Sequence, residues 1–319
     1  MSSFGMLVRN ENLKIYRRPR TWAMVGILLA ALALLAGLLK WEEQKRAASA
    51  DWKQEVAQTN ERLKQDMAEK EIAANPEARK GMEERIKLND YYIEHDINPY
   101  DNSLWTVVNA SSALIVLVTL LTVVVAADMV AAEFSWGTIK LLLVGPASRT
   151  KVLLSKYAAT LLFALFLLVL CFAVAFALGA ALEGSDGLTQ PLVRIGADGS
   201  VHEGSMLLNA LQQYGFGVVQ LIMYVTMAFM ISASFRSSSM AIAFSLLFIL
   251  MGNTLVGLLS GYEWVKYVLF ANVDLSQHVD GTPLRPEMTL PFSVAMLAGY
   301  YLLFQLVAWI MFAKRDVAG

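Results

Sequence analysis

Six stretches of roughly twenty apolar residues, none containing Asp, Glu, Lys, Arg or His, constrain this chain more than any other feature of its sequence. A helix rises about 1.5 Å per residue, so a stretch of this length spans a hydrocarbon layer about 30 Å thick. Backbone groups in lipid must be paired within the segment, which favours helices. We therefore predict an all-α, polytopic membrane protein whose six transmembrane helices occupy residues 22–39, 105–127, 157–182, 206–233, 240–260 and 292–313.

The composition supports a membrane location and disfavours several other classes of protein. Hydrophobic residues make up 56% of the 319 residues and charged residues 17%, against about 25% charged in soluble domains. No basic face is present that would bind nucleic acid. The single cysteine, Cys171, has no partner in the chain for a disulfide. The sequence lacks H-E-x-x-H, and its histidines (His95, His202 and His278) fall in predicted outer loops, so we expect neither a metal site nor an intramembrane enzyme.

The distribution of Lys and Arg predicts the orientation of the spans. With the N-terminus inside, twelve basic residues lie next to the spans on the inner side, against three in the two short outer loops. Positively charged residues near the spans are retained on the cytoplasmic side. We therefore expect both termini to be cytoplasmic.

The first 20 residues are expected to form a cytoplasmic helix in the membrane interface. Apolar residues lie on one face of this helix, with two exceptions opposite to it: Phe4, Leu7, Val8 and Ile15 against Met6 and Leu13. A solvated positive tail is the alternative. Pro19 marks the turn into the first span, residues 21–39. A cleaved signal peptide is the weaker interpretation, because the apolar run is longer than the roughly 7–15 residues of such peptides.

Residues 40–104 form the one large polar region and are predicted to be an extracytoplasmic helical hairpin. Apolar residues recur every three or four positions in residues 52–67 and again in residues 82–93, and Asn75-Pro76 separates the two patterns. The hairpin either forms a compact outer cap or receives a substrate or a partner. Residues 105–319 then hold spans two to six.

The cytoplasmic connection between the second and third spans, residues 128–152, carries the most informative pattern. A short helix is expected to begin near Ser135 and to end at Gly145 and Pro146, because glycine and proline together interrupt helices. Ser148 can cap the helix that follows. A short helix tied at both ends across the inner membrane surface can transmit force to the spans.

This connection resembles the conserved inner loop of type-2 ABC exporter permeases, the ABC-2 family. The resemblance is carried by Glu133, Gly137-Thr138, the leucines that follow, Pro146-x-Ser148-Arg149 and Lys156, together with the layout of an interfacial helix and six spans. It covers nearly the whole chain in architecture but only about 25 residues in motif. Within the family the chain is similar to permeases of bacterial drug and peptide-antibiotic resistance or bacteriocin-immunity exporters, which implies the plasma membrane of a bacterium.

The resemblance implies that this loop contains a coupling helix docking on a separate cytoplasmic ATPase. It assigns that role to Glu133, Gly137, Thr138, Lys140, Pro146, Ser148 and Arg149. It also implies two permease subunits, identical or different, assembled with two ATPases that bind ATP and magnesium. The chain itself has no G-x-x-x-x-G-K-[S/T] loop, so we expect it to bind no cofactor and to be no enzyme. The alternative role for Glu133, Lys140 and Arg149 is to anchor helix ends at the membrane interface.

Two stripes of uncharged polar residues mark either the transport pathway or contacts between helices. They are Asn109, Ser112, Thr119 and Thr122 in the second span, and Asn209, Gln213, Gln220 and Tyr224 in the fourth.

The function expected from these observations is that of the membrane-spanning subunit of an ATP-driven exporter of amphipathic compounds such as peptides, drugs or lipids. No residue specifies the substrate. An ion-coupled secondary transporter is disfavoured, because such proteins place ionisable residues within their spans and these spans carry none. A non-transporting sensor or immunity component coupled to an ATPase is the remaining alternative.

Overall fold

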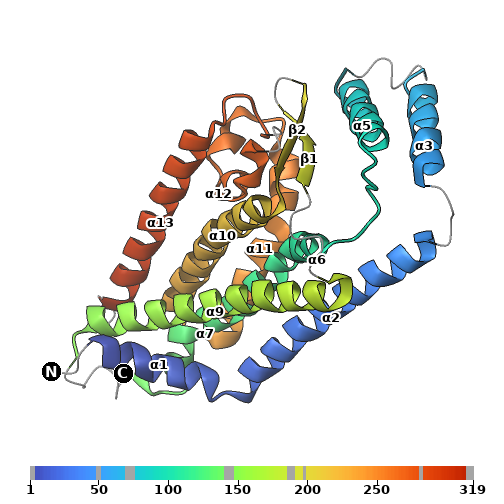
Figure 1. The fold of residues 1–319 in the computed structure, drawn as a ribbon. Coiled ribbons are helices and arrows are strands. Elements are labelled where there is room, and N and C mark those ends of the chain that lie inside the picture. The colour runs from blue at the N-terminus through green and yellow to red at the C-terminus, as the bar shows by residue number, and fades with distance from the viewer. Residues whose placement is uncertain are drawn as a thin grey trace. The chain divides into compact units, whose positions relative to one another are not determined.

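Among the residues that the structure describes, six helices are long and apolar enough to cross a membrane, as predicted (Figure 1). The computed structural model describes residues 4–47, 52–68, 76–139, 147–184, 191–196, 199–279 and 283–313. The spanning helices are α2 (Pro19–Ala47), α6 (Leu104–Ser111) continuing through a 3₁₀ turn, η1 (Ser112–Leu114), into α7 (Ile115–Ser135), then α9 (Arg149–Glu183), α10 (Met206–Ser234), α11 (Ser238–Leu259) and α13 (Leu290–Ala313). The protein is therefore an all-α, polytopic membrane protein.

Several spanning helices are longer than the apolar stretches that predict them. α7 continues past residue 127 to Ser135 and so includes Asp128 and Glu133. α9 begins at Arg149 and includes Lys156. The expectation that the spans lack ionisable residues is thus correct for the apolar stretches and wrong for the helices. Helical hydrogen bonding does not stop where polarity begins, and these charges are paired between helices.

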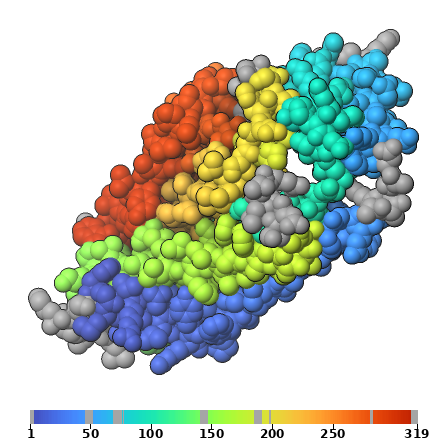
Figure 2. Space-filling model, in the orientation of Figure 1, coloured from blue at the N-terminus to red at the C-terminus, as the bar shows by residue number. Residues whose placement is uncertain are grey.

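The chain divides into two compact units. Unit 1 comprises Met1–Leu32, Ser112–Ala173 and Gln213–Gly319, and unit 2 comprises Ala33–Ser111 and Val174–Gln212. In unit 1 the connection between α11 and α13 contains η3 (Glu263–Tyr267), α12 (Leu269–Asn272) and η4 (Ser276–His278). The apolar windows of the second and fourth spans are 61% and 67% buried, whereas those of α11 and α13 are 11% and 17% buried. The second and fourth spans are therefore interior helices, and α13 lies at the surface of its unit (Figure 2).

α1 (Phe4–Tyr16) is a helix, as expected, and the C-terminal end of its apolar face packs against protein, whereas Phe4 at the other end of that face is exposed. Ile15 is buried, and the Tyr16 ring makes edge contacts with Phe163 and Phe166 of α9 at centroid distances of 5.9 and 5.6 Å. Met6 and Leu13, on the opposite face, are exposed. The apolar residues available to an interface are therefore Phe4 together with the two that sequence reasoning treated as exceptions. Pro19 is the first residue of α2, a position where its missing N–H group has no cost.

Unit 2 contains the two polar helices expected after the first span, α3 (Trp52–Asp66) and α5 (Pro76–Glu94), which contact each other. The side chain of Asn60, which is buried, donates to Asp90 Oδ1 at 2.8 Å and accepts from Asn89 Nδ2 at 2.7 Å. The sequence did not predict the antiparallel ribbon of β1 (Pro191–Ile195) and β2 (Val201–Ser205) that packs on α5. The Tyr91 hydroxyl donates to Glu203 at 3.0 Å and ties the ribbon to that helix.

Candidate functional site

A group of four charges, three of them buried, joins three helices at the predicted cytoplasmic side of unit 1. Lys156 Nζ of α9 donates to Glu133 Oε1 of α7 at 2.7 Å and to Glu11 Oε2 of α1 at 2.8 Å. The Lys156 side chain is 1% exposed, and those of Glu11 and Glu133 are 8% and 11% exposed. Buried charges persist when they are paired. We call Glu11, Lys14, Glu133 and Lys156 the Lys156 cluster.

Lys14 closes this cluster from the side nearer solvent. Its Nζ lies 2.8 Å from Glu11 Oε1 and 3.3 Å from Glu133 Oε1. Burial alone would lower the pKa of Lys14, but the hydrogen bond and the charge of Glu11, with the charge of Glu133, raise it above its ordinary value. Lys14 therefore stays protonated, and the two acids and two bases of the cluster balance.

A second group of polar residues surrounds Asp128, which lies on the same helix α7. We call Arg18, Arg20, Asp128 and Ser238 the Asp128 cluster. The Asp128 carboxylate, 3% exposed, accepts from Arg18 Nη1 at 2.6 Å and also accepts from Arg20 and from the Ser238 hydroxyl. The Arg18 guanidinium stacks over the Trp136 ring, 4.8 Å from its centroid. This cluster therefore ties the turn between α1 and α2 to α7 and to the start of α11.

Hydroxyl groups add a third tie between α7 and the connection from α10 to α11. Ser232 Oγ accepts from the backbone N–H groups of Val130 and Ala131, both at 3.0 Å. Ser135 Oγ accepts from the backbone N–H of Ser238 at 3.1 Å. The C-terminal part of α7 is therefore bound to α1, α9, α10 and α11 together.

The predicted coupling residues lie on both flanks of the connection between α7 and α9. Thr138 donates to the Glu133 carboxylate, and Gly137 adopts a φ of +70°, a left-handed conformation that glycine adopts without strain. Ser148 caps α9 as predicted, accepting from Lys151 N at 3.4 Å. Arg149 donates to the carbonyl of Ala313 at 2.9 Å.

The short helix of this connection was predicted to begin near Ser135, and this is wrong. α7 continues through Ser135, a turn follows at residues 136–138, and Ile139 is the first helical residue after it. Lys140 and Pro146 lie outside the described residues. Glu133 is directed into the protein, toward Lys156 and Thr138, and does not face solvent as a docking residue would.

The two polar stripes make contacts within the protein. Asn209 Nδ2 donates to Asn109 Oδ1 at 3.1 Å, a hydrogen bond between two spans. Thr119 and Thr122 donate to carbonyls of their own helix, both at 2.8 Å. Of the other stripe residues, Ser112, Gln213 and Gln220 are half-buried. Tyr224 is buried and hydrogen-bonds Gln220.

Sequence reasoning missed Glu11 and Asp128 as members of a site, although one signal was present. Glu11 lies in the centre of the apolar face of α1, where an acid needs a partner. Among the described residues, no group of three or more His, Cys, Asp or Glu side chains could hold a metal ion. The arrangement can therefore couple helix movements through paired charges, and it offers no evident chemistry on a bound metal.

Comparison with known proteins places the chain in a family without assigned activity. A profile of the family described as "Protein of unknown function (DUF2705)" matches residues 81–318. The chain is 43% identical over 319 residues to "Uncharacterized protein YhcI" of Bacillus subtilis (strain 168), covering 98% of this chain and 99% of that protein. It is 31% identical over 208 residues to "Uncharacterized membrane protein YdbK" of the same organism, covering 64% of this chain and 80% of that protein. The chain thus belongs to the DUF2705 family, a family of unknown function.

Proposed function

We propose that this protein is the membrane-spanning permease subunit of an ATP-binding cassette transporter in a bacterial plasma membrane. A separate cytoplasmic ATPase would bind ATP and magnesium, and a second permease, identical or different, would complete the assembly. The cargo class we propose is an exported amphipathic compound, such as a peptide, a drug or a lipid.

The observation that carries the proposal is the Lys156 cluster. It joins the end of α7 to the start of α9, the two helices that bound the connection at residues 136–148, and joins both to α1. A movement of the end of α7 or of the start of α9 is passed through these ion pairs to the other helix and to α1. A partner that pushes on the connection would therefore move α1, α7 and α9 as one body.

The test is purification of the tagged chain from its native membrane in mild detergent. The proposal predicts that an ATPase with a phosphate-binding loop co-purifies in near-equal amount. After reconstitution in vesicles, ATP hydrolysis should depend on the presence of this chain. Absence of any such ATPase from cross-linked and uncross-linked preparations would refute the proposal.

Arg149→Ala provides a sharper test of the connection, because Arg149 is exposed at the start of α9. We expect ATPase stimulation to fall roughly fivefold or more, the equivalent of about one lost hydrogen bond, while membrane insertion is unchanged. Lys80→Ala, on the polar helix α5, is the matched control and should leave stimulation unchanged.

The buried carboxylates favour one second candidate, an ion-coupled transporter. Ionisable residues in spanning helices commonly carry protons or bind ions. Here Glu133 and Asp128 are paired and lie near the end of α7, whereas transporter sites lie near the middle of the membrane. Uptake or efflux driven by a pH gradient without ATP, and abolished by Glu133→Gln, would favour this candidate. ATP hydrolysis without flux would instead favour a sensor or immunity component.

A further inference from the structure

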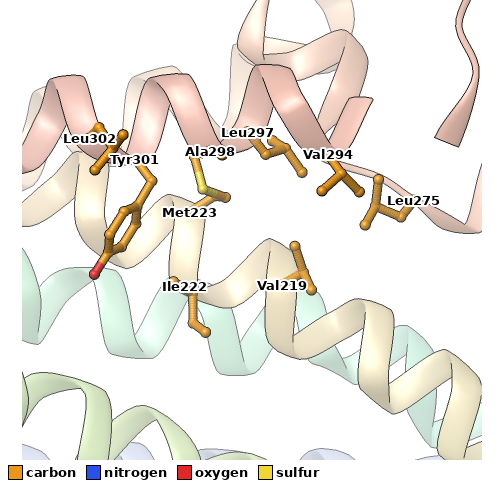
Figure 3. A pocket seen from close by; sticks show the side chains of 9 residues that line it. All are labelled: Val219, Ile222, Met223, Leu275, Val294, Leu297, Ala298, Tyr301 and Leu302. Carbon is orange, nitrogen blue, oxygen red and sulfur yellow. The ribbon is translucent and has the colours of Figure 1, made fainter. Parts of the chain in front are cut away.

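A groove between α10 and α13 has the chemistry of a hydrocarbon-binding site. It has a volume of about 410 Å³, within the range of roughly 300–1,000 Å³ common for ligand pockets. Figure 3 shows the side chains that line it: Val219, Ile222, Met223, Leu275, Val294, Leu297, Ala298, Tyr301 and Leu302. Apart from Tyr301, no lining side chain carries a hydrogen-bonding or charged group.

The groove has a buried floor and an exposed rim. Met223, Leu275 and Leu297 are 3–4% exposed, whereas Val294 and Leu302 on the rim are 48% and 67% exposed. A hydrocarbon chain lying against the floor would therefore enter sideways, past the rim, from the medium around the helices.

The one polar lining residue does not offer its polar group to the groove. The Tyr301 ring lies near Ile222, and its hydroxyl points away from the other lining side chains (Figure 3). Inside unit 1 this hydroxyl bonds Tyr157 of α9, whose own hydroxyl lies 2.7 Å from Thr226 Oγ1. A ligand that needs hydrogen bonds for orientation would find none here.

The position of the groove along α13 identifies the source of its occupant. Its rim runs from Val294 to Leu302, eight residues or about 12 Å at the helical rise. Half of a hydrocarbon layer about 30 Å thick is about 15 Å. The rim begins four residues from the first residue of α13, Leu290, so along α13 the groove covers the depth of one leaflet, the outer one in the predicted orientation. On α10 the groove reaches residues 219–223, in the middle of that helix.

We propose that this groove binds one acyl chain of a membrane phospholipid from that leaflet. An acyl chain fits this groove for three reasons: the lining is apolar, the opening faces sideways, and the length of the groove matches one leaflet. This lipid site is independent of ATP-driven transport, and it would persist in a protein that transports nothing.

The test uses the full-length protein in phospholipid vesicles that contain a phospholipid with a photoreactive diazirine on one acyl chain. We expect labelling to concentrate on peptides that contain residues 219–223 and 294–302, above the labelling of the exposed helix α11. Ala298→Trp should fill the groove and reduce this labelling at least fivefold. Leu303→Trp, at an exposed position of α13 outside the lining, is the matched control and should leave it unchanged.

Three results would overturn the proposal. The first is labelling of the groove peptides no stronger than that of α11. The second is labelling that Ala298→Trp leaves unchanged in a protein that purifies as the parent does. The third is efficient cross-linking between two copies carrying Ala298→Cys, which would assign the groove to a second copy of the protein. If Ala298→Trp fails to fold, Ala298→Leu serves as the smaller filling change.

Discussion

Replacing the buried Lys156 with Met should strongly destabilise the protein, because two carboxylates lose their main partner. The Lys156 side chain is 1% exposed, and the carboxylates of Glu11 and Glu133 lie at 2.8 and 2.7 Å from it. Methionine is unbranched and adaptable, so the change removes charge with little loss of packing. Removing one partner of a buried pair costs about 3–5 kcal/mol. Lys14 still contacts both carboxylates, so we expect the lower value, about 3 kcal/mol.

The measurement is thermal unfolding in detergent, followed by tryptophan fluorescence at one fixed scan rate, because unfolding of such proteins is often irreversible. A loss of about 3 kcal/mol corresponds to a fall in Tm of roughly 6–12 °C, at about 2–4 °C per kcal/mol for a large domain. Lys80→Met is the control. The Lys80 side chain is 77% exposed and lies 3.8 Å from Glu84, and exposed pairs contribute about 0–1 kcal/mol.

A triple variant separates unpaired charge from other effects of the same substitution. Lys156→Met combined with Glu11→Gln and Glu133→Gln leaves no carboxylate in the Lys156 cluster, and neutral replacement of a buried ion pair is often tolerated. We expect the triple variant to regain more than half of the Tm lost by Lys156→Met. The reasoning fails if Lys156→Met unfolds within 2 °C of Lys80→Met, or if the triple variant is less stable than the single one.

Three further substitutions test other parts of the structure by the same thermal assay. Asp128→Asn should cost about 2 kcal/mol, because the lost charge-assisted hydrogen bonds are worth about 1.5–3 kcal/mol and its partly exposed arginine partners can rehydrate; an unchanged Tm would contradict the Asp128 cluster. Gly179→Ala should cost about 1–3 kcal/mol, since the added Cβ would lie 2.7 Å from the backbone oxygen of Leu104, whereas Gly26→Ala meets nothing within 4 Å and should be neutral or slightly stabilising. Gly137→Ala should cost about 1–2 kcal/mol because the backbone φ angle is +70° there. An unchanged Tm of this variant would contradict the left-handed turn at Gly137.

The long apolar stretches predicted the six spans but not their ends. Apolar stretches stop where charges begin, at Asp128 in the second span and before Tyr157 in the third. The helices continue because their backbone hydrogen bonds are local, and because Asp128, Glu133 and Lys156 find partners outside their own helices. Lys156 and Glu11 are 145 positions apart. No local pattern contains that information.

The face of α1 shows a signal that was present and not used. The apolar face was recognised, but Glu11 lies at its centre, four positions before Ile15. An acid within an apolar stripe predicts a buried partner, which turned out to be a lysine on another helix. The ribbon of β1 and β2 gave no comparable signal in the sequence, because five-residue strands in a polar loop produce no pattern that distinguishes them from coil.

The geometry of Glu133 changes the division of roles within the coupling segment. For Glu133 to bind an ATPase directly, its carboxylate would have to leave Lys156, whose ammonium would then be buried without that partner. Such a loss costs about 3–5 kcal/mol, more than the roughly 1.5–3 kcal/mol gained from a hydrogen bond to a charged group. Glu133 therefore holds the end of α7 in place, and under the proposed function docking would fall to exposed residues such as Arg149. In consequence, Glu133→Gln should lower both thermal stability and ATPase stimulation, whereas Arg149→Ala, which loses an exposed hydrogen bond to Ala313, should lower stimulation with little change in thermal stability.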